Sequence, residues 1–170
     1  MIAGMPAKTP LRLVMTAATS ALILAGCSAP VDITAAEDAA NPDCAHTMIA
    51  LPDELAGLKK RRTNAQATAA WGEPAQVVLR CGAPDPGVTA DLCVGANGVD
   101  WITREGDPNW TLISYGRTPT IEVTFNPDDV SSSSVMTELA KPVSMIEATK
   151  SCPSRAQDVD LGKTQQSEND

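Results

Sequence analysis

Four polar residues suited to ligand recognition lie at or near the ends of predicted strands: Arg80, Asp100, Tyr115 and Arg117. Adjoining strands could bring them together beside the indole rings of Trp71 and Trp101. Arginine offers a planar fork for carboxylate or phosphate, and indole offers a flat apolar wall. This candidate patch predicts a small anionic-ligand site or the centre of a partner surface. The alternative is a structural ion pair between Arg80 and Asp100 over core tryptophans.

Residues for catalysis are few. The single histidine, His46, lies beside Cys44, and a disulfide at that cysteine would exclude a Cys–His nucleophilic pair. The chain has no nucleophile-elbow motif and no phosphate-binding glycine loop, and the serines at 131–134 have no evident base, so we assign them to helix capping. We therefore expect no catalysis. An accessory enzyme that acts on cell-wall material, with Asp100 or Glu73 as acid or base, is the alternative.

We also expect no metal and no cofactor. No pair of cysteines has the two-to-four-residue spacing of a zinc knuckle, and one histidine cannot complete such a site alone.

Residues 1–27 have the organisation of an export signal. Lys8 and Arg12 precede an apolar run that is too short to span a bilayer. The sequence Leu-Ala-Gly-Cys at 24–27 follows and resembles the lipobox of bacterial lipoproteins, in which the cysteine carries diacylglycerol and becomes the new N-terminus. Two acyl chains suffice for stable membrane attachment. We predict a lipid anchor on Cys27 at the extracytoplasmic face of the cell membrane; an ordinary secretory signal or a plain membrane anchor is the alternative.

The cysteine count agrees with export. Without Cys27, the chain has an even set of four, which predicts two disulfides: Cys44, Cys81, Cys93 and Cys152. Three connectivities are possible. We favour Cys81 with Cys93, which would close a loop rich in Pro and Gly, and Cys44 with Cys152, which would tie the ends of the domain together.

The length of 170 residues fits one domain. We expect a flexible tether over 28–43, a single domain over 44–153 and a disordered tail over 154–170. Short helices are expected at 51–58 and 65–70. Residues 76–81 read as a strand, and three strands of an antiparallel meander follow at 99–104, 110–115 and 120–126, with a tight turn at Asn97 and Gly98.

The last of these strands has the clearest alternation, with Ile121, Val123 and Phe125 on one face. Apolar residues at helical spacing predict a helix over 132–150, which Pro142 would kink or divide. The fold class is therefore α+β: a small antiparallel sheet of three to four strands covered by one or two C-terminal helices, with two disulfides.

The charge distribution disfavours nucleic acid as a partner. After Cys27 the chain has 11 basic and 21 acidic residues, which repel a phosphate backbone. The one basic run is Lys-Lys-Arg-Arg at 59–62. It could contact anionic lipid or an anionic envelope polymer; because four charges are at the lower limit for lipid recognition, we favour a solvated connector.

Several short motifs resemble one family when taken together with the lipobox: AAWGEP at 69–74, VVLRCG at 77–82, NGVDW at 97–101, SYGR at 114–117 and TIEV at 120–123. Over residues 44–152 the chain is similar to an actinobacterial family of envelope lipoproteins known as domain of unknown function 3515. The resemblance implies an envelope location and a shared small domain, and it implies no activity. We predict a binding or assembly module whose partners are envelope proteins or cell-wall polymer, in addition to the membrane.

Overall fold

Within residues 28–153, which the computed structural model describes, eight antiparallel strands form one sheet in the order β1-β2-β3-β4-β8-β7-β6-β5. The elements are α1 (Cys44–Ala50), β1 (Glu54–Leu55), β2 (Leu58–Arg61), β3 (Thr68–Trp71), β4 (Val77–Ala83), β5 (Leu92–Ala96), β6 (Val99–Arg104), β7 (Trp110–Ser114), β8 (Thr120–Phe125) and α2 (Ser132–Val143). The predicted signal peptide, Cys27 and the predicted tail lie outside the described residues. The α+β class is confirmed, and the sheet is larger than the three to four strands predicted.

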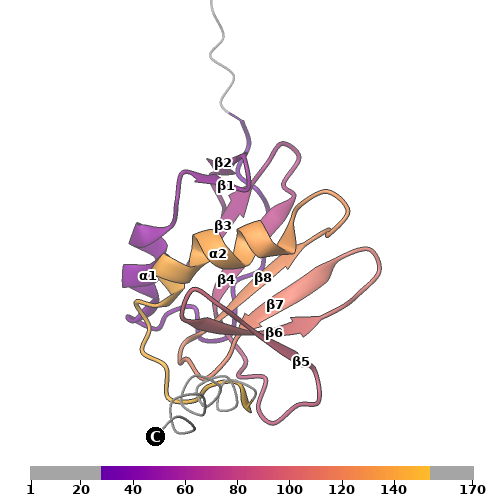
Figure 1. Cartoon of the computed structure of the whole chain (residues 1–170). Coiled ribbons are helices and arrows are strands. Elements are labelled where there is room, and N and C mark those ends of the chain that lie inside the picture. Colours follow the sequence, from indigo (N-terminus) through magenta and orange to yellow (C-terminus); the bar gives the residue numbers. More distant parts are fainter. Residues whose placement is uncertain (1–27, 154–170) are drawn as a thin grey trace, which may run out of the picture.

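Helix α2 lies across one face of the sheet (Figure 1) and packs on strands from both of its ends, β1 on one side and β5 and β6 on the other. The strands present apolar residues to it in alternation. In β8, for example, Ile121, Val123 and Phe125 are buried whereas Glu122 and Thr124 are half-buried, as the sequence pattern predicts. The core thus lies between the helix and the inner face of the sheet.

The helix begins where its serines predict. Ser131 is the N-cap, and its side chain accepts a hydrogen bond from the backbone N–H of Ser134. Val135, Leu139 and Val143 are buried at helical spacing. The helix ends at Val143, immediately after Pro142, and not at residue 150, because proline removes a backbone donor and disfavours continuation.

Both short helices predicted before the sheet are wrong. Residues 51–58 contain the β1–β2 hairpin, in which Leu55 pairs with Leu58 around a turn at Ala56 and Gly57. Both turn residues have positive φ, as a two-residue hairpin turn requires. The three-residue spacing of the leucines, which we interpreted as helical, fits the two ends of such a turn equally well.

Residues 65–70 contain the start of β3, which is buried along its whole length between β2 and β4. Ala69 and Ala70 favour helix locally, but pairing with Leu79 and Val78 of β4 overrides that preference. Helix α1 and strand β5 were not predicted from the sequence. The turn between β5 and β6 is confirmed, since Asn97 and Gly98 both have positive φ.

The disulfide pairing that we favoured is wrong. The bonds join Cys44 to Cys81 and Cys93 to Cys152. Cys81 on β4 and Cys93 on β5 are four strands apart in the sheet, about 19 Å at the usual strand spacing, whereas a disulfide requires Cα atoms within about 7 Å. One bond therefore fixes α1 to β4, and the other fixes the segment after α2 to β5.

Residues 28–43 do not behave as a free tether. Val31 pairs with Thr63 beyond the end of β2, the backbone N–H of Asp38 donates to Gly82 O at 3.0 Å, and Ala39 is buried. A segment whose backbone groups and side chains have such partners is part of the domain. The domain therefore includes the described residues before Cys44, and does not begin at Cys44.

Peptide mapping without reduction should recover the pairs Cys44 with Cys81 and Cys93 with Cys152. Replacing either pair by alanine should lower the free energy of unfolding by about 2–5 kcal/mol, because each bond closes a long loop in the unfolded chain, of 37 and 59 residues' separation. Denaturant unfolding measures this loss. Recovery of a peptide linking Cys81 to Cys93 would contradict the described fold.

The contact of residues 38 and 39 with β4 depends on Gly82. It has φ +88°, and a Cβ there would lie 2.3 Å from the carbonyl oxygen of Asp38. We expect Gly82→Ala to lower the free energy of unfolding by about 3 kcal/mol through backbone strain and overlap. The matched control is Gly87→Ala, with φ +65° and open space around the added Cβ, which should cost about 1 kcal/mol. Equal losses in the two variants would show that the segment is not held against β4.

Candidate functional site

The sheet separates the two charges that we expected to meet. Arg80 Nε donates to Glu122 Oε1 at 2.9 Å, so its ion-pair partner lies on β8. In the register of the sheet, Arg80 is aligned with Ile102 of β6, three strands away, and Asp100 lies two residues further along that strand. Three strand spacings are about 14 Å. The predicted ion pair between Arg80 and Asp100 is therefore wrong.

The two tryptophans of the patch are core residues. Trp71 and Trp101 are fully buried, and the Nε1–H of Trp71 donates to Pro52 O at 3.0 Å. Neither ring offers a wall to a ligand. Tyr115 is half-buried and lines a shallow hollow of about 180 Å³ next to Cys93 and Pro153.

Asp100 and Arg117 hold the segment that follows α2. Asp100 Oδ2 accepts a hydrogen bond from the backbone N–H of Cys152 at 2.8 Å. The guanidinium of Arg117 donates to Ile146 O and, at 3.0 Å, to Gly98 O. Both side chains are buried, at 5% and 6% exposure. Burial lowers the pKa of Arg117, and the charge of Asp100 opposes that shift.

The same segment lies directly on the turn before Arg117. Thr149 donates from its backbone N–H to Gly116 O at 2.7 Å, and a Cβ on Gly116 would lie 2.3 Å from Lys150 O. Together with the disulfide of Cys152, these contacts make Asp100 and Arg117 a structural latch, by which we mean the pair that fixes residues 146–152 to β6 and β7. The candidate patch is thus not one site: Arg80 and Arg117 have separate partners.

The surface hollows around β2 lie away from this patch. Three of them adjoin β2, with volumes of about 350, 350 and 510 Å³, and Arg61 lines all three. The first is lined by Ser28, Ala29, Lys60, Arg61, Arg62 and Glu73. This basic end, defined by Lys59, Lys60, Arg61 and Arg62, is where the described chain begins (Figure 1).

Arg61 and Arg62 clamp the first described residues. Arg61 donates from one nitrogen to Glu73 Oε1 at 2.9 Å and from the other to Ser28 Oγ at 2.5 Å and Ala29 O at 3.0 Å. Ser28 Oγ in turn donates to Glu73 Oε2 at 3.2 Å, and Arg62 donates to Ser28 O at 3.3 Å. This Ser28 clamp was not predicted. Its only signal in the sequence is a run of four cations in an acidic chain.

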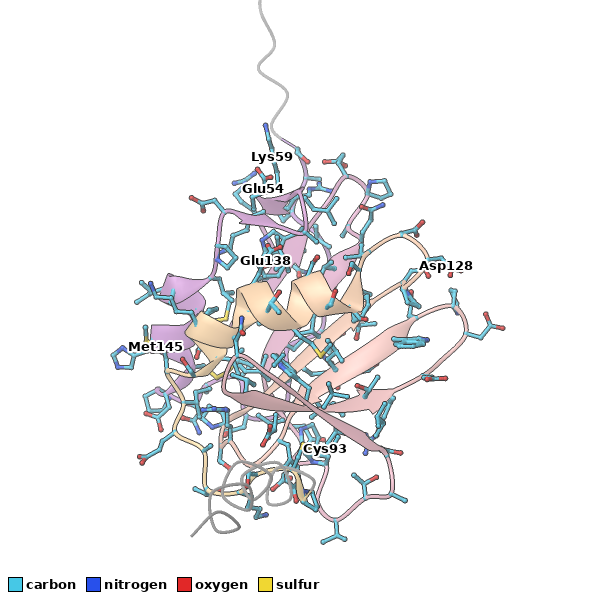
Figure 2. All side chains as sticks on the ribbon, in the orientation of Figure 1. Glu54, Lys59, Cys93, Asp128, Glu138 and Met145 are labelled. Atoms are coloured by element: carbon cyan, nitrogen blue, oxygen red, sulfur yellow. A yellow bond between two sulfur atoms is a disulfide. The ribbon has the colours of Figure 1, made fainter. Side chains whose placement is uncertain are left out.

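Two cations of the basic end are accessible to solvent. Lys59 and Arg62 are exposed, and Figure 2 shows Lys59 near Glu54, its partner across the β1–β2 pair. Asp53 lines the same hollow as Lys60. Asp32 accepts a hydrogen bond from Asn64, and Glu138 accepts one from the N–H of Ala56 in the β1–β2 turn. With Glu73, five carboxylates therefore accompany four cations at this end.

Between Ser28 and Pro153, no group of three or more His, Cys, Asp or Glu side chains is placed to hold a metal ion. In the same part of the chain, neither helix has the length and apolar character needed to cross a membrane.

Fold and surface define an α+β domain with an eight-stranded antiparallel sheet, one helix over its inner face and two disulfides. The chain belongs to the family described as Protein of unknown function (DUF3515), whose model matches residues 8–152. Neither a curated protein nor a solved structure matches the chain.

Removing the charge of Asp100 tests the structural latch. Asp100→Asn takes away the anion that offsets the buried Arg117, so we expect the free energy of unfolding to fall by about 3 kcal/mol and amide exchange over 146–152 to accelerate. Arg80→Gln is the control, since its ion pair with Glu122 is partly exposed, and should cost about 1 kcal/mol or less. Unchanged stability and exchange in Asp100→Asn would return this residue to the candidates for ligand binding.

Proposed function

We propose that the protein is an exported lipoprotein, acylated on Cys27, that acts without catalysis as a binding or assembly module in the bacterial cell envelope. The observation that carries this proposal is the Leu-Ala-Gly-Cys sequence at 24–27, directly followed at Ser28 by a chain that is already part of the domain. Cleavage before Cys27 would leave the whole described fold intact and place the acylated residue next to it.

The disulfides support export. Cys44–Cys81 and Cys93–Cys152 each have Cα atoms within 6 Å, at 5.9 and 5.8 Å, and bonds of this kind persist in oxidising compartments outside the cytoplasm. The family match begins at residue 8, so the leader belongs to the part of the chain that family members share. Both observations agree with a secreted and anchored protein.

The environments of the reactive residues favour a non-catalytic role. Cys44 is in a disulfide, which removes a nucleophile from beside His46. Asp100 accepts the N–H of Cys152, and Glu73 is bound to Arg61 and Ser28. Both carboxylates that an enzyme would use as acid or base thus contribute to structure.

No observation favours the alternative of a small anionic-ligand receptor built on Arg80 and Arg117. Arg80 is paired with Glu122, and the guanidinium of Arg117 is buried and donates to backbone carbonyls. A receptor needs cations that are free to bind its ligand. Among the residues described, the exposed Lys59 meets that need better than either arginine.

Metabolic labelling with a palmitate analogue tests the anchor. We expect the wild-type protein to carry the label and to partition into the membrane fraction, and we expect Cys27→Ser to lose both, because the thiol is the acceptor of the lipid. Cys27→Ser should keep the same denaturant midpoint, since the two disulfides do not involve this residue. Membrane retention of unlabelled Cys27→Ser would instead favour a plain membrane anchor.

A further inference from the structure

The position of the Ser28 clamp determines which end of the domain lies next to an anchor on Cys27. Four hydrogen bonds join residues 28 and 29 to Arg61, Arg62 and Glu73. Beyond them, Val31 N–H donates to Arg62 O at 2.9 Å and Asn64 N–H to Val31 O at 3.2 Å. Consecutive Cα atoms are about 3.8 Å apart, so Cys27 is within one residue of the basic end.

Charge distinguishes this end from the rest of the domain. Four of the nine Lys and Arg residues at 28–153 are the consecutive ones at 59–62. The carboxylates of Asp53, Glu54 and Glu73 lie beside them. Two more lie at the same end: Asp32, which accepts a hydrogen bond from Asn64, and Glu138, which accepts one from Ala56 N–H. With four cations and five carboxylates, this end is close to neutral, with a net charge of about −1. The other described residues comprise five basic and twelve acidic side chains. An anionic surface would therefore repel the rest of the domain far more strongly than this end, whose exposed cations it would attract.

The distance between the domain and the membrane determines whether this difference in charge affects how the domain is oriented. At physiological ionic strength, charges interact over about 8 Å before screening dominates. A long flexible tether would hold the domain beyond this range, and a chain clamped from Ser28 onward does not. An anchor on Cys27 would, together with the clamp, hold Lys59 and Arg62 within this range of the lipid headgroups, where basic side chains bind anionic lipid.

We propose that the basic end is a docking surface for anionic phospholipid headgroups, contacted by Lys59 and Arg62, and that the Ser28 clamp fixes the domain on the membrane in this one orientation. The proposal deepens the function given above and rests on its anchor at Cys27. It changes the interpretation of residues 59–62 from a solvated connector to a membrane-facing strand.

The test supplies the anchor chemically, so that it does not depend on acylation in the cell. Four cysteines are in disulfides, which leaves the thiol of Cys27 to react. The mature chain from Cys27 to Asp170, which contains every described residue, is coupled to maleimide lipid in two kinds of vesicle: phosphatidylcholine alone, and phosphatidylcholine with phosphatidylglycerol. Amide hydrogen exchange over residues 53–64 is measured on both.

We expect slower exchange over 53–64 on the anionic vesicles only, and loss of this protection at high salt, which screens the charges. Lys59→Gln alone, which leaves the Ser28 clamp intact, should reduce the protection, and Lys59→Gln combined with Arg62→Gln should abolish it. The charge-conserving pair Lys59→Arg and Arg62→Lys should keep it. Unchanged exchange of the untethered variants in solution establishes that the hairpin remains folded.

The matched control is Lys141→Gln with Lys150→Gln, which removes two exposed cations elsewhere and lowers the net charge by the same amount. It should keep the protection. Equal exchange on neutral and anionic vesicles would overturn the proposal, as would an equal loss in the control pair. Protection that appears only with a soluble polyanionic wall polymer would overturn it in favour of that partner. Failure of palmitate labelling would affect the anchor alone.

Discussion

The pairing of β4 with β8 is the constraint on which the rest of the structure depends. Each half of the sheet is a simple meander, β1 to β4 and β5 to β8, and this one pairing joins them into eight strands. Its register places Leu79 beside Val123 and Cys81 beside Ile121, which puts the apolar residues of both halves on one face. Helix α2 can then cover the two halves together, and their cores become one core.

Each half of the sheet has one disulfide. Cys81 lies on β4 and holds α1 on the first half, and Cys93 lies on β5 and holds the segment after α2 on the second. Neither bond crosses the β4–β8 pairing. The two halves are therefore joined by backbone hydrogen bonds and apolar packing. The disulfides instead hold the peripheral segments, which bury fewer apolar side chains.

Sequence reasoning succeeded where a single local signal decides the structure. The alternation at Ile121, Val123 and Phe125 predicted a strand, the Asn97–Gly98 pair predicted a turn, and the serines before Val135 predicted a helix start. It failed at residues 65–70, where alanines favour helix but the neighbouring strands impose extended backbone. It failed also for the disulfides, because loop length says nothing about which strands are neighbours.

The candidate site shows the same division. The sequence singles out the tryptophans and arginines as candidate binding residues, yet Trp71 and Trp101 are part of the core, and Arg117 is part of the structural latch. Residue type does not distinguish a buried structural arginine from a ligand-binding one, since both need acceptors. The Ser28 clamp could not be predicted, because it joins residues 28 and 73 through an arginine between them in sequence, at 61. Such a contact exists only after the sheet has formed.

The two ends of the described chain lie far apart in the fold. Ser28 is bound at β2, near one end of the strand order, and Cys152 is bonded to β5, the strand at the other end (Figure 1). Any polypeptide joined after Cys152 therefore starts from the side of the domain opposite the chain's entry. A reporter or affinity domain joined directly after Pro153 would start on the side away from the surface that holds Ser28, which makes this position the practical choice for display or for isolating intact complexes.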